Sequence, residues 1–165
     1  MAVDSRTFKD LMARVAQTVT IVTIPSDDGP AGLTVSAFTS VSAEPPIVLV
    51  CIDKQASTLG YFLDGHAFTV NIMPRGTGDV AMLFATRGAD RFGTVGWHHV
   101  EGSGPILEGA FEAMVCRIVE RTEMGDHWVI YGEVEEAFGP AELSLNGVED
   151  PLIWLHRGFV HTEPD

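Results

Sequence analysis

Short apolar segments rich in β-branched residues recur along almost the whole chain, and this pattern constrains the fold more than any other feature. Segments 18–25 (TVTIVTIP), 47–52 (IVLVCI), 110–122 and 127–137 are the clearest examples. Segments of this kind at regular spacing, with only three short helical patterns between them, favour an antiparallel barrel over an alternating βαβ sheet. We therefore expect a mainly β, antiparallel fold.

The rest of the sequence completes this order of elements. Further strands are expected over residues 31–38, 67–73, 94–100 and 152–160. Apolar residues at helical spacing predict three short helices, following Asp4 and over residues 57–63 and 78–86. An acidic loop is expected over residues 140–150. No repeat, low-complexity tract or linker divides the chain, so we expect residues 1–165 to form a single domain.

The charge balance limits the classes of partner. The chain has 10 Lys and Arg against 23 Asp and Glu, a formal net charge of −13. A field of this sign repels phosphate backbones and anionic lipid head groups, so we expect no nucleic-acid and no membrane partner. The longest apolar run, residues 47–52, is too short to cross a bilayer, and the first residues do not resemble a secretory signal. We expect a cytoplasmic protein.

The cysteines and histidines do not predict a metal site. Cys51 and Cys116 each lie in an apolar segment, where a free thiol behaves as a small core residue, and no CxxC or Cys/His spacing is present. His98 and His99 are adjacent, so on a strand they would point to opposite faces and could not bind one metal together. We therefore expect no metal.

Residues 76–81 (GTGDVA) match the G-x-G-x-x-A fingerprint of dinucleotide-binding folds, and Glu101 follows about twenty residues later. That fingerprint also requires a second, buried parallel strand after the helix. The segment that follows, TRGADRFGTVGWHHVEG, is polar and glycine-rich. The residues therefore favour an ordinary loop and helix start over a dinucleotide-binding site.

Two polar segments are better candidates for a binding site. If residues 34–42 form one strand, Thr34, Ser36, Ser40 and Ser42 share a face with Phe38, a surface suited to the polar edge of a flat heterocycle. The alternative is an edge strand with solvated hydroxyls. Further on, DKQAST (53–58) enters a predicted helix, where hydroxyl and free N–H groups near Lys54 could bind a phosphate or form an ordinary helix cap.

In combination, these segments resemble the flavin reductase family of FMN-binding split barrels. The resemblance is carried by GLTVSAFTSVSAEPPIVLVCID, the following Ser-Thr pair, FATRGADRF, GDH and the terminal HRGF. Their order and spacing cover nearly the whole chain. Proteins of this family are the small reductase components of two-component flavin monooxygenases. The resemblance implies an antiparallel Greek-key split β-barrel that forms a homodimer, binds FMN or FAD, oxidises NADH or NADPH, and supplies reduced flavin to a separate oxygenase.

The resemblance also assigns roles to residues. The ring and ribityl chain of the flavin would contact Thr34, Val35, Ser36, Ala37, Phe38, Thr39, Ser40 and Ser42. The ring would be bordered by Cys51, Ile52 and Asp53, and the phosphate would be held by Ser57, Thr58, Ala85, Arg87 and Arg91. The nicotinamide nucleotide would bind at His127 and along His156, Arg157, Gly158 and Phe159.

Several alternatives stay open. Many relatives carry Asn where this chain has Ser36 and Lys where it has Arg91, which leaves the choice between FMN and FAD undecided. From the residues alone, a turn residue is the preferred explanation of His127, and His156 could be a core histidine of the last strand. Because hydride transfer needs no acid or base, His127 is expected to orient the nucleotide. The rival function is a flavin- or haem-binding module without reductase turnover.

Overall fold

The computed structural model describes residues 2–139 and 150–161, so most of the predicted acidic loop lies outside the described residues. The helices are α1 (Ser5–Met12), α2 (Leu59–Asp64) and α3 (Gly78–Ala85). The strands are β1 (Gln17–Thr18), β2 (Thr20–Ile24), β3 (Ala31–Val35), β4 (Phe38–Ala43), β5 (Pro46–Asp53), β6 (Ala67–Ile72), β7 (Trp97–His98), β8 (Ile106–Leu107), β9 (Glu112–Met124), β10 (His127–Phe138), β11 (Ile153–Leu155) and β12 (Gly158–Val160). None of the described helices has the length and apolar character needed to span a membrane.

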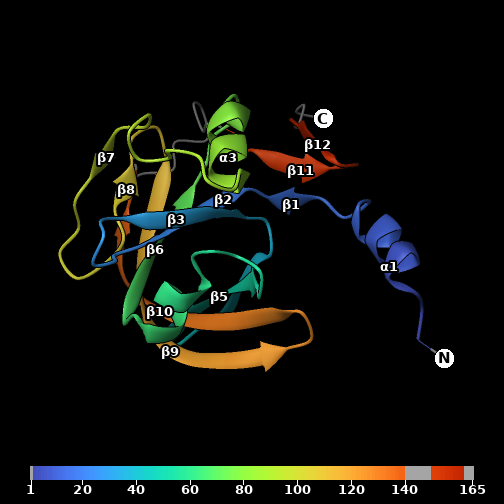
Figure 1. The fold of residues 1–165 in the computed structure, drawn as a ribbon, viewed down its shortest axis with the longest axis horizontal. Helices are drawn as coiled ribbons and strands as arrows, with labels where there is room; N and C mark the ends of the chain where they lie inside the picture. The colour runs from blue at the N-terminus through green and yellow to red at the C-terminus, as the bar shows by residue number, and fades with distance from the viewer. Residues whose placement is uncertain (1, 140–149, 162–165) are drawn as a thin grey trace.

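The expected mainly β, antiparallel architecture is confirmed. Seven strands form one sheet in the order β3-β2-β6-β9-β10-β5-β4, and every pairing in it is antiparallel. The sheet curls around its core, so that β3 at one end contacts β5 near the other (Figure 1). A small sheet, β1-β11-β12, lies beside this barrel, and α3 lies over strands β2 and β3 (Figure 1).

Strand β2 is the centre of the molecule because it is buried on both faces. All five of its residues are buried, and alternate side chains point to opposite sides of a strand. Val22 and Ile24 belong to the barrel core with Phe62, Phe68 and Ile130. Ile21 joins a second apolar cluster, which includes Phe84 of α3 and Leu152. This second cluster holds α3 and the C-terminal strands against the barrel.

The long hairpin β9–β10 depends on a glycine where it crosses the barrel core. A Cβ at Gly132 would lie 2.7 Å from the Cβ of Cys116 and 2.7 Å from Cζ of Phe68. Both neighbours are fully buried, and real Cβ atoms essentially never approach this closely. The register of the hairpin shifts beside this residue, between Tyr131 and Gly132. A glycine is therefore required for the ring of Phe68 to fill the barrel.

Three of the expected strands are wrong in detail. The segment 18–25 is divided at Val19 into β1 and β2, which belong to different sheets. The segment 34–42 is divided at residues 36–37 into β3 and β4, with an irregularity between Ser40 and Ser42, so the hydroxyls do not form one straight row. The segment 152–160 is a hairpin of β11 and β12. In each case tertiary pairing interrupts an apolar run that looks continuous.

The dinucleotide-binding alternative is also excluded. The strand before Gly76 is β6, which lies between β2 and β9 and is antiparallel to both. Among the described strands, all pairings are antiparallel, so the parallel strand that the fingerprint requires is missing. Residues 76–81 are instead a loop and the first turn of α3.

Candidate functional site

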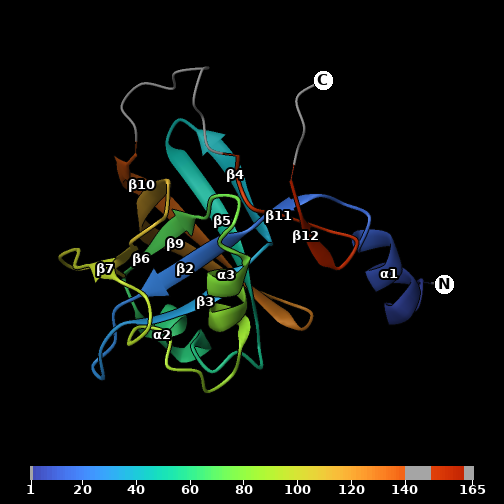
Figure 2. The ribbon, with the colours of Figure 1, turned by 90° about the horizontal axis from the view of Figure 1, so that it is seen from above.

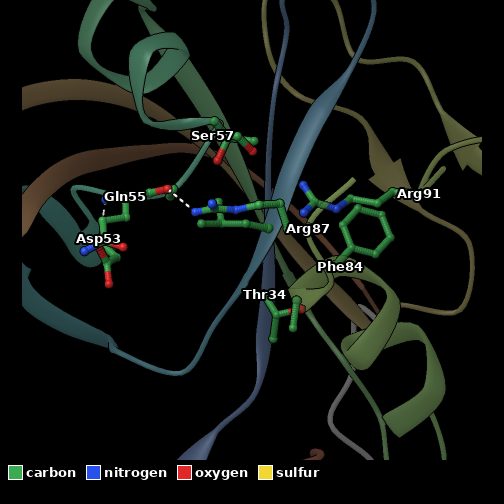
Figure 3. A pocket seen from close by; sticks show the side chains of 11 residues that line it. Thr34, Asp53, Gln55, Ser57, Phe84, Arg87 and Arg91 are labelled. Atoms are coloured by element: carbon green, nitrogen blue, oxygen red, sulfur yellow. Dashed lines mark hydrogen bonds between the residues drawn. The ribbon is translucent and has the colours of Figure 1, made fainter. Parts of the chain in front are cut away.

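A cavity of about 300 Å³ opens beside the C-terminal end of α3 (Figure 3). It brings together residues that are far apart in the chain. Seven of the predicted phosphate- and ring-binding residues line it: Thr34, Asp53, Ser57, Thr58, Ala85, Arg87 and Arg91. Strand β3, the end of β5, the loop before α2 and the loop after α3 each contribute part of the wall.

Two arginines make this cavity suitable for an anion. Arg91 donates hydrogen bonds to the backbone oxygen atoms of Gly32 at 2.5 Å and Thr86 at 2.9 Å, and Arg87 donates to the backbone oxygen of Gln55 at 2.8 Å (Figure 3). Both guanidinium groups are therefore held in place by neutral carbonyls, and neither forms an ion pair with a described residue. Burial lowers the pKa of Arg91 from its usual value, but arginine stays charged at neutral pH.

Two polar atoms in the wall of the cavity are buried without a hydrogen-bond partner in the protein. They are Oγ1 of Thr58, whose residue is 6% exposed, and Nε of Arg91. An unsatisfied buried polar group costs about 1–3 kcal/mol, so such groups call for a partner. A phosphate bound in the cavity would meet the hydroxyl and guanidinium donors of these two residues and neutralise the guanidinium charge. The residues present thus fit the phosphate group of a flavin nucleotide.

A second cavity, of about 180 Å³, continues from the first along the side of α3. The two cavities share Thr34 and Ala85. The second cavity is mostly apolar and is lined by Val19, Thr34, Ser36, Ala81, Met82, Ala85, Trp154 and Phe159. The aromatic rings of Trp154 and Phe159 pack edge to face, with their centroids 5.1 Å apart. The pair of cavities therefore offers a cationic end and an apolar end to one ligand.

Other predicted site residues lie in different surroundings. Val35 and Ile52 are buried in the barrel core, and Phe38 and Ala37 pack against it. Cys51 is half-buried opposite Val129. On β4, Thr39 and Ser40 are exposed, and Ser42 is partly buried. Lys54, which the sequence places near a phosphate, instead pairs with Glu123 at 2.5 Å.

His127 is the first residue of β10 and lies directly opposite Asp53 in the pairing with β5. This pairing places it beside the rim of the first cavity, which Asp53 helps to line. Its Nδ1 atom is 2.7 Å from Oδ1 of Asp126, and 40% of its side chain is exposed. The hydrogen bond and the charge of His127 lower the pKa of Asp126. The imidazole is thus oriented by one nitrogen, and the other is available to a ligand.

His156 and Arg157 form the two-residue turn of the β11–β12 hairpin, so the core position considered for His156 is wrong. Both residues have positive φ, 53° and 62°, as two-residue hairpin turns require, although Asn and Gly are the usual residues there. Gly158 and Phe159 follow on β12, and Phe159 reaches the second cavity. The turn stands at the outer end of the hairpin that walls this cavity (Figure 2).

The sequence did not identify several residues that line the cavities. Gln55 lies inside the quoted segment 53–58, and its backbone oxygen holds Arg87. Phe84 packs into the second apolar cluster and also lines the first cavity. Trp154 is brought to the site by the pairing of β1 with β11. The positions of Gln55 and of Phe84, which begins the quoted segment FATRGADRF, could have suggested a role, whereas Trp154 is an ordinary apolar residue of its strand.

Fold and cavities together define an antiparallel split barrel with two adjoining cavities, one lined by two arginines and the other mostly apolar. The family model described as a flavin reductase like domain matches residues 12–163. The reductase component of a 4-nitrophenol 4-monooxygenase/4-nitrocatechol 2-monooxygenase from Rhodococcus opacus is 36% identical over 161 residues, which are 98% of this chain and 83% of that protein. The chain therefore belongs to the flavin reductase family.

Two other similar proteins carry names that describe different activities. The actinorhodin polyketide dimerase of Streptomyces coelicolor is 37% identical over 160 residues, 96% of this chain and 87% of that protein. The structure of the NADH:FAD oxidoreductase SgcE6 of Streptomyces globisporus, in complex with NAD and FAD fragments, has a TM-score of 0.89 and 30% identity. That alignment covers 100% of this chain and 98% of the other.

Proposed function

We propose that this chain is an NAD(P)H-dependent flavin reductase that reduces FMN or FAD and passes the reduced flavin to a separate monooxygenase. The observation that carries the proposal is the arginine-lined cavity, in which Thr58 and Arg91 hold buried polar atoms without a protein partner. Membership of the flavin reductase family supports the same ligand. The reductase component from Rhodococcus opacus supports a separate oxygenase as the recipient.

In this proposal the chain binds the flavin by its two ends. Thr58, Ser57, Arg87 and Arg91 hold the phosphate, with the backbone around Ala85 alongside. The segment from Thr34 to Ser42 and the residues Cys51, Ile52 and Asp53 surround the ring and ribityl chain. When bound, the flavin supplies the acceptor for a hydride from the nicotinamide ring. The protein's own contribution is to hold the two rings in contact and to exclude water.

The nicotinamide nucleotide binds between two hairpins in this proposal. His127 on β10 donates a hydrogen bond to it, because Asp126 holds the other ring nitrogen. His156, Arg157, Gly158 and Phe159 on the β11–β12 hairpin form the opposite wall. Residues 1–165 act as one domain, which forms a homodimer in the cytoplasm. The family match over residues 12–163 supports the single domain.

The first test is NADH and NADPH oxidation by the purified protein, followed at 340 nm with FMN, FAD or no flavin. We expect oxidation that rises and saturates with added flavin. Comparing NADH with NADPH and FMN with FAD then identifies the electron donor and the flavin that the protein uses. His127→Ala should raise the KM for the nicotinamide nucleotide and lower kcat/KM, while flavin binding survives. Unchanged nucleotide kinetics in this variant would remove the role given to His127.

A flavin- or haem-binding module without turnover is the second candidate. The observation that favours it is the relative named for polyketide dimerisation, which shows that this family includes names other than reductase. Under this alternative the protein retains a flavin or haem, and neither NADH nor NADPH is oxidised in any mixture. A flavin titration on the same preparation then decides whether the barrel binds flavin at all.

A further inference from the structure

Helix α2 begins directly after two of the residues that hold the flavin phosphate in the proposed function. Ser57 and Thr58 line the first cavity and precede Leu59, the first residue of this six-residue helix. So short a helix is marginal in water, and its last carbonyl groups have no partner within the helix. The buried side chains of Leu59 and Phe62 anchor it to the barrel core. A contact that fixes the far end of α2 therefore also helps to fix the residues before it.

Arg121 of strand β9 provides such a contact. Its Nε atom donates a hydrogen bond to the backbone oxygen of Phe62 at 2.9 Å, and its Nη2 atom donates to the backbone oxygen of Gly65. Basic side chains near the end of a helix can bind its last carbonyl groups in this way. Arg121 forms no ion pair with a described residue. Both bonds therefore come from a guanidinium group that is committed to the end of α2.

An irregularity in the β9–β10 pairing points Arg121 toward α2. On β9, Ile118 belongs to the barrel core, so regular alternation would place Glu120 on the same face. The pairing instead shifts by one residue at Val119, and Arg121 lies opposite Ile130, which also belongs to the core. Bulges of this kind re-aim side chains. The bulge thus brings a guanidinium group, in place of a carboxylate, to the carbonyl groups that end α2.

The beginning of the phosphate-binding segment is fixed separately, by the turn of the β9–β10 hairpin. The N–H of Lys54 donates to the backbone oxygen of Asp126 at 3.0 Å. Thr58 lies between this attachment and the one at Arg121, and its buried Oγ1 lacks a protein partner. A binding group has to be held within about 0.5 Å of its productive position. Movement of the far end of α2 would therefore carry the Thr58 hydroxyl away from a bound phosphate.

We infer that Arg121 is a positioning residue for the flavin phosphate: it fixes the end of α2 and thereby the places of Ser57 and Thr58 in the first cavity. This inference rests on the proposed function, which puts the phosphate at these two hydroxyls. Arg121 lines neither the first nor the second cavity. It acts from the opposite end of a helix that is about 9 Å long, and so it influences the ligand only through α2.

The test compares FMN with riboflavin, which has the same ring and ribityl chain but no phosphate. Arg121→Met keeps the apolar stem and removes both donors, so we expect the Kd for FMN to rise about tenfold and the Kd for riboflavin to stay within about twofold of wild type. Fluorescence titration well below the thermal midpoint measures both constants. Arg121→Lys keeps one donor and should raise the Kd for FMN about threefold, which carries the same test if the methionine variant does not fold.

Arg117→Met is the matched control. Arg117 also lies on β9 and donates two hydrogen bonds, but its partners are the carboxylates of Glu133 and Glu135. This variant removes as many donors from the same strand and should leave the Kd for FMN unchanged. If Arg121 only stabilised the fold, its loss would lower the thermal midpoint without changing the ratio of the FMN and riboflavin dissociation constants.

Three results would overturn the role of Arg121 and leave the proposed function in place: wild-type affinity for FMN in Arg121→Met, equal losses of FMN and riboflavin affinity, or an equal loss in Arg117→Met. A wild-type protein that binds FMN no more tightly than riboflavin would overturn both the phosphate site and the role of Arg121. If the loss is specific to FMN but neither NADH nor NADPH is oxidised, the reductase function ends and the role of Arg121 stands.

Discussion

The guanidinium group of Arg91 donates a 2.5 Å hydrogen bond to the backbone oxygen of Gly32, and this bond ties the loop after α3 to strand β3. A Cβ at Gly32 would lie 3.2 Å from the ring of Phe84, so a larger residue there would crowd the same cavity wall. Arg91 therefore has two tasks. Its terminal nitrogens hold the cavity wall together, and its buried Nε is left for a ligand.

Replacing Arg91 by lysine should weaken flavin binding although the charge is kept. A lysine ammonium is a point charge and cannot reach Gly32, Thr86 and a phosphate from three fixed directions. Loss of a charge-assisted hydrogen bond costs about 1.5–3 kcal/mol, so we expect the flavin Kd to rise about tenfold or more. Titration of flavin fluorescence measures this. Arg75→Lys, outside this cavity, is the control, and equal Kd values for both variants would contradict the role of Arg91.

Replacing Thr58 by valine should have opposite effects on the free protein and on flavin binding. Its buried Oγ1 lacks a partner, so removing the hydroxyl should leave the thermal midpoint of the flavin-free protein unchanged or higher. The flavin Kd should rise, because the phosphate loses a donor. Thr69→Val is the contrasting variant, since the hydroxyl of Thr69 donates to the oxygen of Gly104 at 2.6 Å and its loss should lower the midpoint. A T58V protein that melts as early as T69V would show that the Thr58 hydroxyl is already satisfied.

Gly78→Ala should disturb the second cavity. A Cβ at this position would lie 2.8 Å from Cδ2 of Phe159, so the ring must move away from its edge-to-face contact with Trp154. We expect altered tryptophan fluorescence and a several-fold higher KM for the nicotinamide nucleotide. Gly60→Ala in α2 is the control, because nothing lies within 4 Å of its Cβ and alanine should stabilise the helix by about 0.5–1 kcal/mol. Normal fluorescence and KM in the Gly78→Ala protein would show that Phe159 does not shape the site.

Cys116 should make the protein less stable in alkali. Burial, reinforced by the charge of Glu135, raises the pKa of this thiol from 9.0 to about 12. In the unfolded chain the thiol ionises near pH 9, whereas the folded protein keeps it neutral. Its contribution to stability is therefore complete below pH 9 and is lost between pH 9 and 12, at about 1.4 kcal/mol per pH unit.

Urea unfolding of wild type and Cys116→Ala across this pH range isolates the effect from other titrating groups. The variant should be less stable at neutral pH, because it leaves a small cavity, but its free energy of unfolding should fall less steeply with pH. If the free energy of unfolding fell equally steeply with pH in the two proteins, the Cys116 thiol would have the same pKa in the folded and the unfolded state. Cys51→Ala should show a smaller change, because Cys51 is half-buried.

Much of the fold could be predicted from the sequence because local signals were strong. The cap at Asp4, the helix over 78–86 and the long strands β9 and β10 are formed where expected, since the period of apolar residues matches the element. Strand ends were less predictable. Nothing local marks the divisions at Val19, at residues 36–37 and at His156, because they arise where a strand leaves one sheet or turns in a hairpin.

The sequence by itself determined the chemistry that the site can contain: the hydroxyls of Ser57 and Thr58, the guanidinium groups of Arg87 and Arg91, and the family to which they point. Only the tertiary structure decided which of these groups meet. It turned Lys54 toward Glu123, buried Val35 and Ile52, and joined Thr34 to Arg91 across one cavity. The physical reason is that side-chain surroundings depend on strand register and on buried contacts between distant segments, and local residue patterns do not specify these.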